Sequence, residues 1–171
     1  MSARAAPRNC ALALFLIVAV LVPVAVRAQV LPPRPVSVFV NTAQPMSFGA
    51  FFQGVTGGSV IIYPDGTRST TGDIIGAGMG YSFSPALFEV EGLPGTLVSI
   101  MNGPDVQLNG SNGGSMTLRI GNSSPVSPFI ITSNPPSRTL ISVGGTLSVG
   151  PPAANPSGTY SGTFDIIFIE Q

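Results

Sequence analysis

Short runs in which apolar and polar residues alternate are the feature that most constrains this chain. Examples are "VSVFV" at residues 36–40, "SVIIY" at 59–63 and "TLVSI" at 96–100. Successive side chains of a strand point to opposite faces, so each run predicts a strand with one buried face. No stretch after residue 28 repeats apolar residues at helical spacing. Many short strands bounded by turn residues predict an all-β fold, an antiparallel β-sandwich.

Glycine and proline divide these runs. All 21 glycines and all but two of the 17 prolines lie after residue 28. "PDGT" at residues 64–67 predicts a turn, because glycine accepts a positive φ there. "RTLISVGGTLSVG" predicts a hairpin that turns on Gly144-Gly145. Residues 72–82 and 121–138 are predicted to form the main loops.

The N-terminus has the composition of an export signal. Two arginines precede the apolar run "CALALFLIVAVLVPVAV" at residues 10–26, and Val26 and Ala28 fit the −3 and −1 positions of a cleavage site. An uncleaved membrane anchor is the alternative, since the run is just long enough to cross a bilayer. A proline within the run favours cleavage. We therefore expect residues 1–28 to be a signal peptide and residues 29–171 to be a single β-sandwich domain.

Removal of the signal would leave a chain with few charges. Cys10, the only cysteine, would leave with it, and residues 29–171 would keep four arginines and seven carboxylates, a formal net charge of −3. Phosphate binding needs clustered cations, so we expect no nucleic-acid partner, and no membrane span is expected in the mature chain. A surface with so little charge repels its neighbours weakly. That favours self-association or association with other exported subunits.

Side chains that carry out catalysis are scarce. The chain has no histidine and no lysine, which excludes Ser-His-Asp triads, Schiff-base lysines and ordinary zinc sites. Glu89 and Glu91 share one face of a strand at a spacing near that of inverting glycosidases, but the solvated face of a strand gives the same pattern. Asp65, Asp73 and Asp105 lie among glycine and proline and would either bind calcium or form turns. We expect no enzyme and no cofactor.

The last strand pattern, "GTYSGTFDIIFIEQ" at residues 158–171, raises the question of what pairs with it. Alternation predicts one continuous apolar face, formed by Tyr160, Phe164, Ile166 and Phe168. The opposite face becomes apolar at Ile167 and Ile169, which suits a strand covered on both faces. An exposed flat edge is an association site. We expect the four residues to form an acceptor edge for a strand of the same chain or of another molecule.

The first strand pattern allows two interpretations. Val36, Val38 and Val40 form either the first strand of their own domain or a donor strand that completes the sheet of a neighbour. Only residues 29–35 would precede this strand after cleavage. Because they leave no room for a separate donor strand, donation would have to use residues 36–40.

Several segments carry a family resemblance: "PVSVFVNTAQPMSFGAFF", "GGSVIIYPDGTRS", "FEVEGLPGTLVSI" and "GGTLSVGPPAANPSGTYSGTFDIIFIEQ". They resemble an uncharacterised bacterial family, domain of unknown function 4402, whose members are secreted by Gram-negative bacteria. "GTYSGTFDIIFI" is also similar to the last strand of archaic chaperone–usher pilins and spore-coat-U-like proteins, which borders a groove filled by another subunit. This similarity implies an immunoglobulin-like or pilin-like sandwich, although the chain lacks the cysteine pair of the commoner pilins.

These observations predict an exported structural or surface protein, a fimbria-like subunit that assembles by strand pairing. The expected location is the periplasm, the outer-membrane surface or the extracellular space. The alternative is a monomeric extracytoplasmic binding module for a carbohydrate or protein ligand, with its site in the loops near Asp73 and at residues 121–138. Sugar sites usually use exposed aromatic residues, and the chain has no tryptophan, so the structural protein is preferred.

Overall fold

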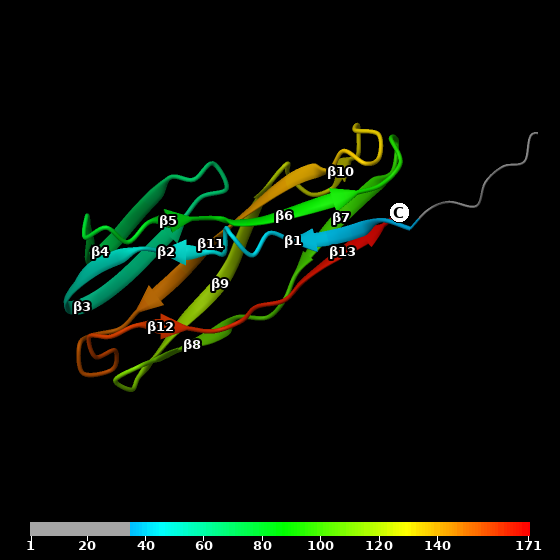
Figure 1. The fold of residues 1–171 in the computed structure, drawn as a ribbon. Helices are drawn as coiled ribbons and strands as arrows, with labels where there is room; N and C mark the ends of the chain where they lie inside the picture. The colour runs from blue at the N-terminus through cyan, green and yellow to red at the C-terminus, as the bar shows by residue number, and fades with distance from the viewer. Residues whose placement is uncertain (1–34) are drawn as a thin grey trace, which may run out of the picture. The chain divides into compact units, whose positions relative to one another are not determined.

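The computed structural model describes residues 35–171, and the signal peptide expected at residues 1–28 lies outside them. The described part contains thirteen strands and no helix, so it has no helix able to cross a membrane. Figure 1 shows the strands β1 (Ser37–Val40), β2 (Ser47–Phe48), β3 (Ala50–Ile62), β4 (Arg68–Ala77), β5 (Phe83–Ser84), β6 (Ala86–Glu91), β7 (Leu97–Asn102), β8 (Val106–Gly110), β9 (Ser115–Ser124), β10 (Phe129–Ile130), β11 (Thr139–Val149), β12 (Tyr160–Ser161) and β13 (Ile166–Glu170).

The main sheet has eight strands, and all of its pairs are antiparallel. Six strands follow the order β1-β6-β11-β9-β8-β12. β11 is long enough to have two neighbours along one edge, since its first half pairs with β6 and its second half with β3. β4 pairs with β3 and extends that end of the sheet. β11 therefore lies at the centre of the sheet, between β9 and these two neighbours.

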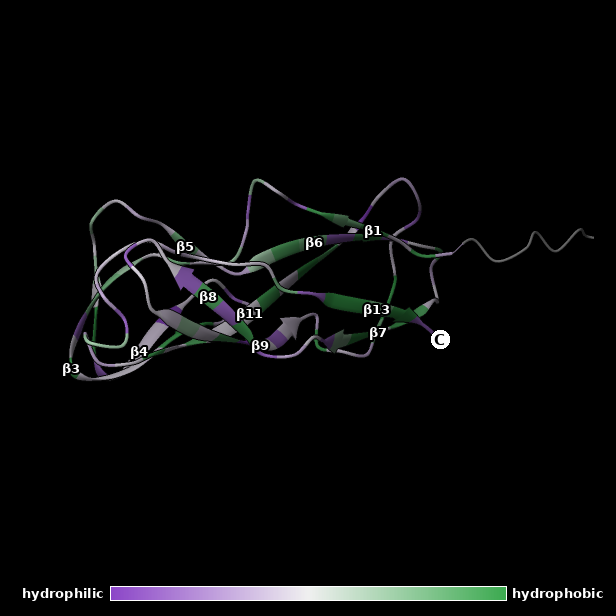
Figure 2. Ribbon diagram, turned by 90° about the horizontal axis from the view of Figure 1, so that it is seen from below, coloured by the Kyte–Doolittle hydropathy of each residue, from purple (hydrophilic) through white to green (hydrophobic). Residues whose placement is uncertain are grey.

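A second sheet, in the order β10-β7-β13, packs against the part of the main sheet that contains β6. The rings of Phe88 in β6 and Phe168 in β13 make contact between the sheets, with centroids 5.6 Å apart. Seen from below, β6 and β1 lie in one layer and β7 and β13 in another (Figure 2). β2 and β5 form a separate two-stranded ribbon. The prediction of an all-β antiparallel sandwich is confirmed.

One apolar cluster joins the two sheets. Val60 and Ile62, which share one face of the strand predicted at residues 59–63, are 0% and 1% exposed. The other fully buried large side chains are Val90, Val98, Ile131, Ile141 and Val143. Burial of each such side chain stabilises the fold by roughly 1.5–3 kcal/mol.

The C-terminal segment is not one continuous strand, as the alternation predicts, but two. β12 pairs with β8 in the main sheet, and β13 pairs with β7 in the second sheet. The chain changes layer between them, at residues 162–165, and its partner changes layer at residues 103–105. The two breaks are joined by a hydrogen bond from Gly103 N to Asp165 O, 3.0 Å long. A side chain at Gly103 would lie against that same carbonyl oxygen, so glycine permits the close approach.

The predicted hairpin at Gly144-Gly145 is wrong, because β11 runs straight through both glycines. Its register with β9 shifts between Val143 and Gly145, where β11 exchanges its neighbour β6 for β3. A Cβ atom at Gly144 would collide with the carbonyl oxygen of Ile62. The glycines therefore allow a bulge and close strand packing, a use of glycine that the sequence pattern does not distinguish from a turn.

The turn at residues 64–67 is confirmed, and the loop predictions hold only in part. Gly66 has φ +85°, and Asp65 Oδ1 accepts hydrogen bonds from the hydroxyl and the backbone N–H of Thr67. These bonds, the hydroxyl first, lower the pKa of the Asp65 carboxyl. Residues 72–77, predicted as loop, belong to β4, and residues 121–124 belong to β9.

Candidate functional site

The last strand, β13, has a neighbour on one edge only. It is the outermost strand of its sheet. Asp165 O accepts from Gly103 N, and Gln171 N donates to Leu97 O, so the odd-numbered residues direct their backbone groups toward the β7 side. Because these directions alternate along an antiparallel strand, Ile166, Phe168 and Glu170 direct theirs outward. Within residues 35–171 no strand pairs with that outer edge.

The first strand, β1, forms the corresponding edge of the main sheet. It pairs with β6 of the same chain, the arrangement expected of a first strand. Asn41 N donates to Leu87 O, which fixes the alternation. Val38 and Val40 therefore direct their N–H and C=O groups away from β6.

The side chains of the same two valines are exposed although they face inward. Val38 lies opposite Val90 and Val40 opposite Phe88 in the register of β1 and β6. Opposite residues share a face of the sheet, and Val90 and Phe88 are only 0% and 8% exposed. Val38 and Val40 are nevertheless 41% and 65% exposed. The sandwich therefore leaves part of its inner face uncovered beside β1.

The two free edges lie on the same side of the sandwich, one in each layer. β1 and β13 run in opposite directions there (Figure 1), and β13 is among the most hydrophobic segments of the ribbon (Figure 2). At the start of β1, the backbone N–H of Val36 donates to Glu170 Oε2 over 3.2 Å. This bond links the two edges at one end.

A groove of about 850 Å³, lined by both polar and apolar residues, lies between the β2–β3 segment and the β12 segment. Its walls are residues 46–53 and residues 156–162, and none of its lining residues is charged. The lining includes the buried core residues Phe48, Leu108, Met116, Leu118 and Leu147. We call the side of the sandwich bounded by β1, the β2–β3 segment, β12 and β13 the open side.

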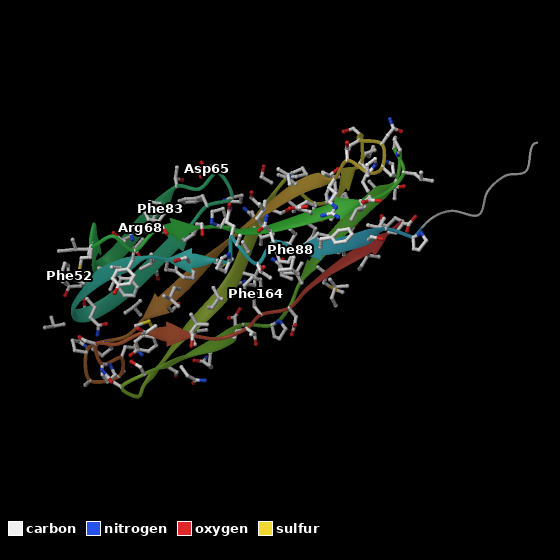
Figure 3. The ribbon with its side chains drawn as sticks, viewed as in Figure 1. Phe52, Asp65, Arg68, Phe83, Phe88 and Phe164 are labelled. Carbon is white, nitrogen blue, oxygen red and sulfur yellow. The ribbon has the colours of Figure 1, made fainter. Side chains whose placement is uncertain are left out.

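Arg68 fixes one wall of this groove. Its guanidinium donates to the carbonyl oxygens of Phe48 and Ala50, over 3.0 and 3.1 Å. It also lies over the ring of Phe83, 4.4 Å from the centroid, as Figure 3 shows. The carbonyl groups at the end of β2 and the start of β3 are thus held by one cation. This contact keeps the wall of the groove, with its phenylalanine side chains, in place.

The predicted acceptor residues lie on the open side. Tyr160 belongs to β12, Ile166 and Phe168 belong to β13, and Phe164 lies in the break between these strands. All four are partly buried and pack against the core. The expectation that the end of this segment is covered on both faces is not met in the single chain, since Ile167 and Ile169 are 52% and 39% exposed.

The groove wall formed by residues 46–53 was missed by the sequence interpretation. The signal was present, since "MSFGAFF" places three phenylalanines within five residues, and Phe48, Phe51 and Phe52 all line the groove. The pattern alone does not show that this wall faces residues about 110 positions later in the chain.

A charged cluster lies on the outer face of β6, where alternation places Glu89 and Glu91. Arg138 contacts both carboxylates, with N···O distances of 2.9 and 3.7 Å. Its guanidinium also lies 3.7 Å from the ring centroid of Phe39 in β1. The two glutamates therefore take part in an ion-pair cluster that holds β1 against β6.

The aspartates proposed for calcium are dispersed. Asp73 lies within β4, not in a turn, and its carboxylate accepts a hydrogen bond from Thr56 N over 3.4 Å. Asp65 binds Thr67 in its turn. Among residues 35–171, no three histidine, cysteine, aspartate or glutamate side chains lie close enough to hold a metal ion.

The family model for "Domain of unknown function (DUF4402)" matches residues 38–169. The chain belongs to the DUF4402 family. The matched region begins within β1 and ends within β13, so the family unit includes both free edges of the open side. No curated protein and no solved structure matches the chain.

Proposed function

We propose that this DUF4402 protein is an exported structural or surface protein that assembles by strand pairing on its open side, as a fimbria-like subunit would. The observation that supports this most is the exposure of Val38 and Val40 on the inward face of β1. A strand added beside β1 would cover them and pair with the outward backbone groups.

The composition of the two edges favours pairing. Soluble proteins protect edge strands with charged residues, proline or bulges. β1 reads "SVFV", and β13 reads "IIFIE", with its one charge at the end. Neither edge has a central charge or a proline that would block an added strand.

Export is supported by the sequence of residues 1–28, which has the composition of a signal peptide. The similarity of the last strand to that of exported pilins points in the same direction. A structural role also fits the scarcity of catalytic side chains. The proposal therefore places a sandwich with few charges, which favours association, outside the cytoplasm.

A matched pair of lysine substitutions tests the proposal. We expect the exported wild-type domain to elute as an assembly that persists on tenfold dilution, measured by light scattering on a sizing column. Val40→Lys places a charge on the open side and should reduce the assembly to single chains. Leu140→Lys places the same charge at a site of similar exposure, 59%, on the outer face of β11, and should leave the assembly intact.

Two results would contradict the proposal. One is a wild-type domain that is folded and monomeric at micromolar concentration. The other is equal loss of assembly in Val40→Lys and Leu140→Lys, which would place the contact surface elsewhere or make it non-specific.

The groove supports a second candidate, a monomeric binding module. Its volume of about 850 Å³ is ample for a ligand, and it is uncharged and lined by the core. It does not include the loops at Asp73 and residues 121–138 that the sequence suggested for a ligand site. The mixed polar and apolar lining suits a peptide that carries side chains of both kinds. Saturable binding of an apolar fluorescent dye to a monomeric wild-type domain would favour this candidate.

A further inference from the structure

We propose that the open side is covered by a second copy of the same chain, in a two-fold dimer in which β1 of each copy pairs with β13 of the other. This inference rests on the strand pairing proposed above and specifies its partner and geometry. Because a two-fold dimer uses both free edges of each copy, it would take the place of the open fibre that a fimbria-like subunit forms. Four observations support it: the placement of the free edges, their register, their charge and the groove beside them.

The placement of the edges fits one symmetry operation. β1 and β13 are edges of different layers on the same side, and they run antiparallel (Figures 1 and 2). A two-fold axis parallel to the strands and midway between the layers exchanges the layers. It sets β1 of one copy beside β13 of the other, antiparallel, in both layers at once. Such an interface is self-complementary and closes after two copies.

The hydrogen bond between Val36 N and the Glu170 carboxylate brings the end of β13 to the start of β1, and we take Val36 and Glu170 as the reference level for this pairing. The rotation preserves that level, so Val38 would lie opposite Phe168 of the other copy, and Val40 opposite Ile166. All four residues direct their backbone N–H and C=O groups away from their own sheets. Opposite residues of that kind form the hydrogen-bonded pairs of an antiparallel ladder.

Charge favours this arrangement over the pairing of identical strands. If β13 paired antiparallel with β13 of the other copy, Asp165 would approach Glu170 of that copy, and like charges across a ladder are destabilising. β1 carries no charge between Ser37 and Val40. Pairing β1 with β13 therefore avoids the repulsion, and Glu170 of one copy would lie close to Val36 N–H of the other.

The groove extends the same interface. β12 and the β2–β3 segment face each other across the groove of one chain. Because the rotation preserves levels along the strands, it would bring β12 of one copy to the β2–β3 segment of the other. The uncharged lining suits such contact. The dimer would then cover both the exposed valines of β1 and the rim of the groove.

Cysteine cross-linking tests the pairing on a clean background, because Cys10 is the only cysteine of the chain and lies in the expected signal peptide. In the proposed register Ser37 lies opposite Ile169 of the other copy as a non-hydrogen-bonded pair, whose Cα separation of about 4.5 Å permits a disulfide. Both side chains are exposed on outer faces, so Ser37→Cys and Ile169→Cys should fold.

The experiment unfolds the two purified single variants together, refolds the mixture so that mixed dimers can form, oxidises it mildly and separates it on a non-reducing gel. We expect a band at twice the mass of the chain from the mixture and none from either variant alone, and a wild-type dimer by light scattering. Three results would overturn the proposed dimer but not strand assembly. They are a cross-link from Ser37→Cys alone, no cross-link from the mixture of dimeric variants, and a wild type that forms multimers of more than two chains. A monomeric wild type would overturn both.

Discussion

The two neighbours of β6 show how position within a sheet decides burial. Val40 in β1 and Ile141 in β11 lie on either side of Phe88 and are both paired with it. All three side chains face the core, yet Ile141 is 0% exposed, Phe88 8% and Val40 65%. β11 has strands on both edges, whereas β1 has one neighbour. The same kind of apolar residue is therefore core in one strand and uncovered in the other.

This difference separates two roles for similar sequences. The centre of the sheet supplies the stability of the single chain, because its side chains are already removed from water. The open side contributes little to that stability and keeps its apolar surface for association. Substitutions at the centre of the sheet should therefore change the free energy of unfolding. Substitutions on the open side should change assembly.

The largest expected difference comes from alanine at the two positions beside Phe88. Ile141→Ala should lower the free energy of unfolding by about 2–5 kcal/mol, since it leaves a cavity in a closed core. Val40→Ala should lower it by less than about 0.5 kcal/mol when measured by urea unfolding of the unassociated chain. Equal losses of unfolding free energy at the two positions would mean that β1 is covered within the single chain.

A smaller effect is expected at the cluster that holds β1 in place. Arg138→Ala removes the ion pairs with Glu89 and Glu91 and the contact with Phe39. We expect a loss of about 1 kcal/mol, since these contacts are partly exposed. Amide exchange in β1 should accelerate while exchange in β11 stays unchanged. Arg119→Ala, at an exposed arginine of β9, is the control. An equal loss of unfolding free energy in this control would show that Arg138 has no particular role in holding β1.

The smallest effect belongs to the exposed turn at residues 64–67. Thr67→Ala removes the hydroxyl that contributes most to lowering the pKa of Asp65, so this pKa should rise toward its ordinary value, as followed by an NMR titration of the carboxyl. A lowered pKa stabilises the fold above the ordinary pKa, and this contribution is lost as the pH falls through the lowered value. An unchanged Asp65 titration would show that the hydroxyl does not bind the carboxylate in solution.

The strands were predictable because alternation is a local property of the sequence. The strand at residues 59–63 and the turn at Gly66 were predicted correctly on that basis. The role of Gly144 could not be predicted, because a glycine between two apolar runs marks either a turn or a bulge. Only the approach of Ile62, more than eighty residues earlier in the chain, decides between them.

The candidate site was predictable in part for the same reason. Tyr160, Phe164, Ile166 and Phe168 were identified as one apolar face, and the structure places all four against the core. Which edges remain unpaired depends on strand order, and strand order is set by contacts between distant segments. The exposure of Val40 and the groove beside residues 46–53 follow from that order, which the local pattern does not contain.

Amide hydrogen exchange along β13 and β1 tests the central claim, that the open side is covered by a strand in the assembled protein. In a single chain, the amides of Ile167 and Ile169 should be protected by β7, whereas those of Val40, Ile166 and Phe168 should exchange rapidly. The account predicts that all five amides are protected in the assembled wild-type protein. In Val40→Lys, rapid exchange should return only at residue 40, Ile166 and Phe168, whose amides point away from their own sheets. Rapid exchange of Val40, Ile166 and Phe168 in a protein that is demonstrably assembled would contradict it.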